Sequence, residues 1–240
     1  MPMADDGGAR GGGRVGDAEA ETAGPRPPAN ALYECYVLLH NVSKRHNVGN
    51  LARNCVAFGV SEVVLTGSAH YNVFGSQGSD CFVRFRHLPT LEDAVSYLRH
   101  ERGCDIIGVE IVDGADRVHE RPFRGNTALM LGNEGAGLTE KQISLCDRFV
   151  YIPQYAEGTA SLNVTTAAAI TLHHFGVWAG FAEAARSGYK FNVGERPLRT
   201  HPRGLAPGDG CSADDVRAAR QHRRAEMDAD PGCEIELFSD

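Results

Sequence analysis

The sequence has few of the features that mark membrane, fibrous or disordered proteins. Its 240 residues contain no uninterrupted apolar stretch of the roughly 18 residues that a spanning helix requires. The nearest candidate, residues 162–181, contains Asn163 and the pair His173 and His174, so we interpret it as a buried helix and expect no membrane partner. Apolar residues are 42% of the chain and charged residues 23%, which is close to the globular average and excludes a wholly disordered or fibrous chain.

Cysteine is scarce and scattered. The seven cysteines include no Cys-x-x-Cys pair and no Cys/His spacing typical of metal ligands, so we expect no zinc or other metal site. Isolated cysteines in predicted helices and strands are typical of a reducing compartment. The first 30 residues lack the apolar centre of a secretory signal and contain five acidic residues, unlike a mitochondrial transit peptide. We therefore expect a cytoplasmic protein, with the nucleus as an alternative.

An excess of positive charge is also missing. The formal net charge of −7 argues against a generally basic nucleic-acid coat. Basic residues are nevertheless concentrated locally, because residues 35–61 contain no acidic side chain. The alternative to a binding patch is an ordinary solvated face. The candidates for contact with nucleic-acid phosphates are Lys44, Arg45, Arg84 and Arg86.

Composition divides the chain into three parts. Residues 1–30 are rich in Gly, Pro, Ala and acidic residues, and we expect them to form a disordered N-terminal tail. Residues 31–188 have the apolar content of a single domain, and residues 189–240 are interpreted as a linker and a charged C-terminal tail. That tail contains an arginine cluster at residues 217–224, for which simple solvation and contact with a nucleic acid are both open.

Within the domain, short apolar runs alternate with helix-length segments. Strands are predicted at 33–39, 62–66, 105–110, 127–131 and 149–152, and helices at 48–59, 91–101, 140–146 and 161–181. Parallel strands separated by helices are joined by crossover connections. The predicted fold class is therefore α/β, with a parallel sheet flanked by helices on both faces.

The first segment with chemical character is residues 46–53, which leads into the first predicted helix. A helix N-terminus presents free N–H groups that suit a phosphate or a carboxylate. Asn47 or Asn50 could cap this helix, and Arg53 would project from the next turn. The alternative is a capped helix whose arginine simply faces solvent.

Two more such segments lie at predicted strand ends. In residues 131–138, glycines after a buried strand let the backbone approach a ligand closely, although the spacing is not the dinucleotide-binding G-x-G-x-x-G. Residues 152–163 again join a strand end to a helix start, where Ser161 is the expected N-cap. Ligands of open α/β sheets bind at this edge, so the three segments could converge on one pocket. The alternatives are an ordinary Gly-rich turn and an ordinary helix cap.

These three segments contain, in order, N-x-G-x-x-x-R (Asn47, Gly49, Arg53), L-G-x-E-G-x-G-L (residues 131–138) and I-P…S-L-N-V (residues 152–164). Together they resemble the three motifs of the SpoU (TrmH-like) RNA 2′-O-ribose methyltransferases of the SPOUT superfamily. The resemblance implies S-adenosylmethionine as cofactor, RNA as substrate and a homodimer. It also implies an α/β sheet whose C-terminal part forms a deep trefoil knot.

The resemblance further assigns residues to the site. The cofactor-binding positions are Leu131, Gly132, Asn133, Gly137, Ile152 and Leu162. The catalytic positions are Arg53, Asn47, Glu134, Ser161 and Asn163. The loop of residues 154–160 departs from the family pattern, because it lacks the usual Met after Pro153 and is one residue longer. We therefore expect altered details in the cofactor loop.

Chemistry gives Arg53 a specific task in this interpretation. A ribose 2′-hydroxyl is a poor nucleophile, and methyl transfer requires that its oxygen lie in line with the methyl group and lose its proton. A guanidinium stays protonated and is not the base. We expect Arg53 to hold the RNA phosphate beside the target ribose with support from Asn47, while Ser161 and Asn163 orient the sugar or the cofactor.

The predicted function is S-adenosylmethionine-dependent methyl transfer to a ribose 2′-hydroxyl of structured RNA. The absence of an added RNA-binding domain favours a compact substrate such as tRNA over rRNA. One alternative is a non-catalytic RNA-binding protein on the same scaffold. Another is a nucleotide-dependent oxidoreductase, which the missing G-x-G-x-x-G disfavours.

Overall fold

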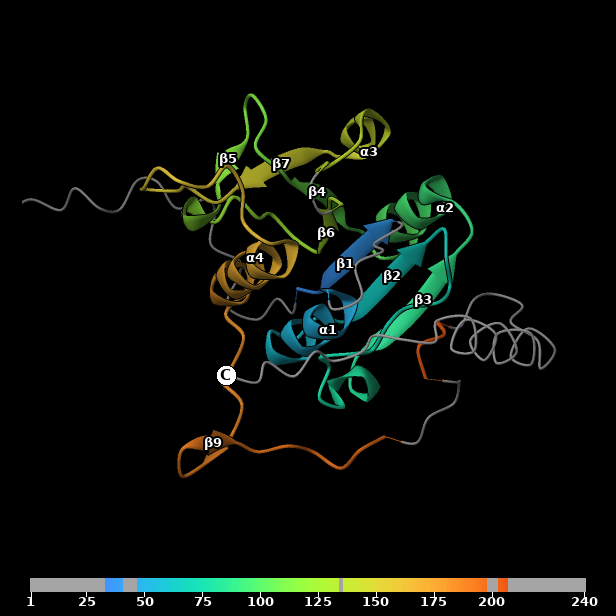
Figure 1. Ribbon diagram of the computed structural model, residues 1–240, viewed down its shortest axis with the longest axis vertical. Helices are drawn as coiled ribbons and strands as arrows, with labels where there is room; N and C mark the ends of the chain where they lie inside the picture. Colours follow the sequence, from blue (N-terminus) through green and yellow to red (C-terminus); the bar gives the residue numbers. More distant parts are fainter. Residues whose placement is uncertain (1–32, 41–46, 134–135, 198–202, 207–240) are drawn as a thin grey trace, which may run out of the picture.

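A parallel sheet of seven strands forms the centre of the molecule (Figure 1). The computed structural model describes residues 33–40, 47–133, 136–197 and 203–206. The strand order is β3-β2-β1-β6-β4-β7-β5, and neighbouring strands in this sheet pair in parallel, which confirms the predicted class. The strands are β1 (Cys35–His40), β2 (Glu62–Thr66), β3 (Arg84–Leu88), β4 (Asp105–Val109), β5 (Asp116–Arg117), β6 (Thr127–Leu131) and β7 (Arg148–Tyr151).

Helices cover both faces of this sheet. On one face, α1 (Asn47–Ala57) and α4 (Val164–Ala179) pack over the side chains of Val37, Leu65 and Leu129. On the other face, α2 (Leu91–Ser96) and α3 (Glu140–Leu145) pack over Leu38, Val64 and Met130. Because both faces are covered, β2 and β6 are buried along their whole length, β1 is buried at all but its last residue, and these strands consist mainly of apolar residues.

The structure adds strands that the sequence analysis did not predict. β3 contains two arginines and a histidine, and only Phe85 and Leu88 are buried, so no apolar run marks this edge strand. β5 has only two residues. Farther along the chain, β8 (Arg186–Ser187) and β9 (Lys190–Phe191) form a small antiparallel hairpin. Predicted helix 91–101 also changes form, because residues 97–101 make a π-helical turn after α2.

The long helix begins three residues later than predicted. α4 starts at Val164, and Asn163 is its N-cap, with its side-chain oxygen accepting from the Thr165 backbone N–H at 2.8 Å. The prediction that Ser161 caps this helix is therefore wrong. The asparagine side chain matches the Ncap position better because its oxygen reaches the N2 amide. The helix α1 begins at Asn47, which places Asn50 within its first turn instead of at a cap.

A short C-terminal segment, residues 203–206, packs against the connection between β2 and β3. The Tyr71 N–H donates to the Gly204 carbonyl, the Ala206 N–H donates to the Ala69 carbonyl, and each distance is 2.9 Å. Leu205 and Ala206 are buried in this contact. These four residues of the predicted tail therefore pack against the domain.

The described residues bear on the expectations about membrane spans, metal sites and reactive cysteines. Of the helices that the structure describes, none combines the length and apolar composition that crossing a bilayer requires. No group of three or more His, Cys, Asp or Glu side chains suited to a metal lies within the described ranges. Burial raises the pKa of the Cys35 and Cys55 thiols, so these free thiols are poor nucleophiles. The trefoil knot stays a prediction.

Candidate functional site

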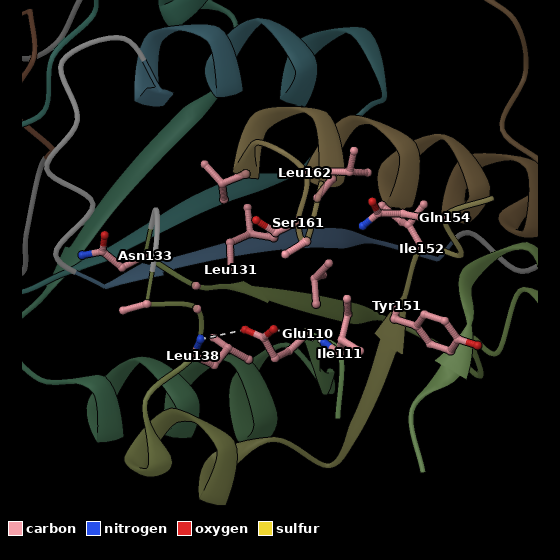
Figure 2. A pocket seen from close by; sticks show the side chains of 17 residues that line it. Glu110, Ile111, Leu131, Asn133, Leu138, Tyr151, Ile152, Gln154, Ser161 and Leu162 are labelled. Carbon is pink, nitrogen blue, oxygen red and sulfur yellow. Dashed lines mark hydrogen bonds between the residues drawn. The ribbon is translucent and has the colours of Figure 1, made fainter. Parts of the chain in front are cut away.

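A cavity of about 440 Å³ opens where β4, β6 and β7 end and the chain approaches α4 (Figure 2). Its position outside the carboxyl ends of parallel strands is the usual ligand position in open α/β sheets. Its volume lies within the range typical of pockets for small molecules and cofactors. Most of its lining is aliphatic side chain and glycine backbone.

Strand register explains why residues distant in sequence meet at this cavity. Val109 of β4 pairs with both Leu131 of β6 and Val150 of β7. The residues that follow these partners, among them Glu110 and Gly132, therefore lie level with one another just beyond the sheet, and they line the cavity. The arrangement follows from parallel pairing, since every carboxyl end lies at the same edge.

The turn after β6 forms one wall of the cavity from backbone atoms. Asn133 and Gly137 exchange two backbone hydrogen bonds of 3.0 Å, which closes the turn. A Cβ atom on Gly132 would lie 2.5 Å from the Gly137 carbonyl carbon, and Gly137 has a φ of +68°. Only glycine fits both positions, because one approach is too close for a side chain and the other conformation is left-handed.

All the residues predicted to bind the cofactor line this one cavity, namely Leu131, Gly132, Asn133, Gly137, Ile152 and Leu162. Ser161, one of the predicted catalytic residues, also lines it. Glu134 lies outside the described residues. The second and third motifs therefore meet in space although 13 residues, 139–151, separate them in the sequence.

The other predicted catalytic residues lie outside this lining. Asn163 is occupied as the α4 cap and also accepts a hydrogen bond of 2.6 Å from the Thr165 hydroxyl. Arg53 is exposed on α1 and is not among the lining residues. Its neighbour Asn54 donates from Nδ2 to the Thr165 carbonyl at 3.0 Å, which ties α1 to the first turn of α4. Asn47 is the first residue of α1.

Packing of the β2–β3 connection explains the glycine of the first motif. Gly49 is buried, and a Cβ atom at this position would overlap the carbonyl oxygen of Phe74. The following residue of that connection, Gly75, lies against the side-chain amide of Asn50. The first turn of α1 is therefore held by backbone contact with residues 73–75.

The residues predicted to contact RNA phosphates are not equivalent in the structure. Lys44 and Arg45 lie outside the described residues. Arg86 donates from Nε to both carboxylate oxygens of the buried Glu62 at 3.2 Å, and its guanidinium lies 4.7 Å from the Tyr97 ring centroid. Arg84 is exposed. It is the first residue of β3, where its backbone lies opposite Glu62 in the strand register, at the opposite end of the sheet from the cavity.

Sequence reasoning missed Glu110, which lies in the cavity wall. The Leu138 N–H donates to its Oε2 at 2.8 Å, and the Ile111 N–H donates to its Oε1 at 3.1 Å (Figure 2). The missed signal was its position, since an acidic residue at the end of a predicted buried strand faces the ligand edge. Gln154 also lines the cavity, directly after Pro153, where the family pattern has Met.

Comparison with known proteins gives the same family as the motifs. The model of the SpoU rRNA Methylase family matches residues 34–173. The tRNA (guanosine(18)-2′-O)-methyltransferase of Thermus thermophilus is 34% identical over 164 residues, which cover 67% of this chain and 79% of that protein. The protein of the same name from Escherichia coli is 31% identical over 140 residues, 57% of this chain and 60% of its own length.

A solved structure also resembles this chain. The SpoU methyltransferase AviRb from Streptomyces viridochromogenes superposes with a TM-score of 0.53 at 26% identity, covering 60% of this chain and 59% of AviRb. The chain thus spans about three fifths of some relatives and four fifths of others. Since the family model matches more than half of the chain and both of its strand-end motifs lie at one cavity, the chain belongs to the SpoU rRNA Methylase family.

Proposed function

We propose that this protein transfers the methyl group of S-adenosylmethionine to a ribose 2′-hydroxyl of structured RNA, with tRNA favoured over rRNA. The observation that supports this most strongly is the meeting of the second and third motifs at one cavity of cofactor size. Fold alone would not support it, because unrelated activities share α/β folds.

The residues of the cavity fit the proposed cofactor. Leu131, Ile152 and Leu162 supply apolar surface suited to a planar base, and the glycine turn lets backbone groups approach a ligand closely. When bound, S-adenosylmethionine supplies an electrophilic methyl group on a cationic sulfur. The lining is aliphatic and partly enclosed, so it excludes much of the water around that group.

The chain's own residues then have to bring the RNA to this cavity. Arg53 is exposed on α1, next in sequence to Asn54, which bonds to the first turn of α4, and its guanidinium is available to a phosphate of a large substrate. By holding that phosphate, Arg53 orients the adjacent 2′-oxygen, and the phosphate or a nearby polar group accepts the proton. Ser161 at the cavity rim orients the sugar, and Asn163 acts by fixing the start of α4.

The relatives' names support the choice of substrate. The relatives from T. thermophilus and E. coli are named for guanosine 18 of tRNA, whereas a relative from Acinetobacter baylyi, 28% identical, is named for 23S rRNA. A cytoplasmic location belongs to the same proposal, because these relatives are bacterial proteins named for modification of tRNA or rRNA. Their names give no support to the nucleus.

A homodimer is a further part of the proposal. Val177, in the last turn of α4, and Phe181, just after the C-cap Gly180, leave 46% and 37% of their surface exposed. Apolar surface at the end of a helix that also packs on the sheet suits contact with a second copy. Light scattering of the purified protein should give twice the 25.8 kDa of one chain.

The decisive experiment is a methylation assay with labelled S-adenosylmethionine and a tRNA transcript, followed by nucleoside analysis for 2′-O-methyl groups. Arg53→Ala should lower turnover by roughly 100-fold or more while leaving cofactor affinity within about twofold. Arg124→Ala, which removes another exposed arginine, is the control and should leave turnover unchanged. Cofactor binding and RNA binding without any turnover in the unaltered protein would favour the non-catalytic alternative, and a loss of cofactor affinity in Arg53→Ala would refute its role.

A further inference from the structure

Glu110 is the only charged side chain among the described residues that line the cavity. It directly follows β4, and its carboxylate lies against Gly137 in the glycine turn. The side chain is partly buried, so its charge is less screened than that of a surface carboxylate. Nothing in the proposed methyl transfer uses this residue.

The carboxylate is fixed in place by the backbone. Each of its oxygens accepts one N–H group, from Leu138 at 2.8 Å and from Ile111 at 3.1 Å. An ionised carboxylate offers about four acceptor positions, so two backbone donors leave capacity for a ligand. A held acidic group facing an otherwise uncharged cavity gives that cavity a negative potential.

Other charges near this wall do not cancel that potential. Arg117 donates from Nε to the hydroxyl of Tyr151, a residue of the lining, at 3.3 Å. That arginine is itself paired with Glu120 at 3.5 Å and is more than half exposed. The positive charge of Arg117 therefore lies at the hydroxyl end of the Tyr151 ring and is offset by the carboxylate of Glu120.

The proposed reaction changes the charge of its cofactor. Transfer breaks the bond between carbon and sulfur and forms a bond between carbon and the 2′-oxygen, which releases its proton. The sulfur keeps the electron pair, so S-adenosylmethionine, with one net positive charge, becomes the neutral S-adenosylhomocysteine. A negatively charged cavity wall therefore attracts S-adenosylmethionine more than S-adenosylhomocysteine.

We propose that Glu110 makes the cavity select the cationic methyl donor over its neutral product, and thereby favours exchange of product for fresh cofactor. This inference rests on the proposed function, since it concerns the same cavity and the same cofactor. The effect needs no direct contact with the sulfur, because a charge across a cavity of this size acts through space. Glu110 also has a structural role, because its hydrogen bond with the Leu138 N–H joins the end of β4 to the glycine turn. The two roles can be separated by comparing ligands of different charge.

The test is titration calorimetry of the full chain with S-adenosylmethionine and with S-adenosylhomocysteine. Glu110→Gln should weaken binding of the methyl donor by roughly 5- to 30-fold while changing binding of the product by less than about twofold. Glu110→Asp keeps the charge and should keep the selectivity, even if both affinities fall because the shorter side chain holds the glycine turn less firmly. Asp113→Asn removes an exposed acid three residues away and is the matched control, with no change expected in either affinity.

The outcomes separate the inference from the proposed function. If Glu110→Gln weakened the binding of both ligands equally, or changed neither affinity, charge selection would be overturned and only the structural role of Glu110 would remain. An equal shift in Asp113→Asn would show a general surface field and would also overturn it. Failure of the unaltered protein to bind either ligand would instead reject the proposed function, and the inference with it. Circular dichroism of each variant establishes that the fold is retained.

Discussion

The two parts of the proposed site are built differently. The cavity wall consists of strand ends and a closed glycine turn, so register within one sheet fixes its residues. The α1 side, which contains Arg53, is positioned by the helix pair α1 and α4 and by the connection between β2 and β3. A preformed cavity and a separate, exposed arginine on α1 suit a reaction in which a small cofactor is enclosed and a large RNA binds at the surface.

The substitution with the largest expected effect on the cavity side of the site is Gly132→Ala. A Cβ atom 2.5 Å from the Gly137 carbonyl carbon would force the glycine turn out of the cavity wall. Affinity for S-adenosylmethionine should fall by roughly 100-fold, equivalent to about 3 kcal/mol, as measured by calorimetry. The control is Gly125→Ala, whose added methyl would meet only the Tyr33 ring at 3.9 Å. Normal cofactor binding by Gly132→Ala would show that the turn is not part of the binding wall.

The corresponding change on the α1 side is Gly49→Ala. Its methyl group would overlap the Phe74 carbonyl, so the first turn of α1 and residues 73–75 must separate. We expect a loss of about 1–3 kcal/mol in the free energy of unfolding and reduced RNA methylation, with cofactor affinity nearly unchanged. Denaturant titration and the methylation assay measure the two effects.

Gly176→Ala is the matched control for that change. It lies inside α4, its added methyl would meet the Phe181 ring at an ordinary 3.5 Å, and alanine is the better helix former. Its unfolding free energy should stay level or rise. If Gly49→Ala lowered cofactor affinity as much as Gly132→Ala, the two sides of the site would not be separable.

A smaller effect should come from the contact that holds the β2–β3 connection. Asp80 is buried, accepts from the Ser76 hydroxyl at 2.8 Å, and lies 3.6 Å from Arg203 of the C-terminal segment. Asp80→Ala leaves the buried Ser76 hydroxyl without this acceptor and should cost about 1–2 kcal/mol in thermal or denaturant unfolding.

Arg203→Ala measures separately what the C-terminal segment contributes to this contact. The arginine is about half exposed, so its loss should cost less than about 1 kcal/mol. An equal cost for the two variants would mean that the C-terminal segment, more than Ser76, compensates the buried charge. Either result shows how far residues 203–206 support the surface on which α1 rests.

The reach of sequence reasoning differed from one element to another. β2 and β6 were predicted with their observed bounds, because buried aliphatic runs between helical segments specify parallel strands. β3 was missed because an edge strand with two arginines has no such run. The N-cap was assigned to Ser161 instead of Asn163 because both are good capping residues, and only the backbone geometry distinguishes them.

The candidate site shows the same limit. Motif residues such as Gly132 and Leu162 were found because their spacing follows a family pattern, and they line the cavity. Glu110 was missed because no motif contains it, and its role depends on a backbone N–H group 28 residues away. The sequence did not reveal that Arg86 forms an ion pair with Glu62, 24 residues earlier, and its contact with RNA stays a prediction.

By itself, the sequence determined the fold class, the order of most strands and helices, the family and the motif residues, since these depend on local patterns of apolar residues, glycines and short motifs. Only the tertiary structure decided which of those residues share a cavity, which arginine is paired within the protein and which carboxylate lines the cavity. Those properties depend on strand register and on packing between segments far apart in the chain, and no local pattern encodes them.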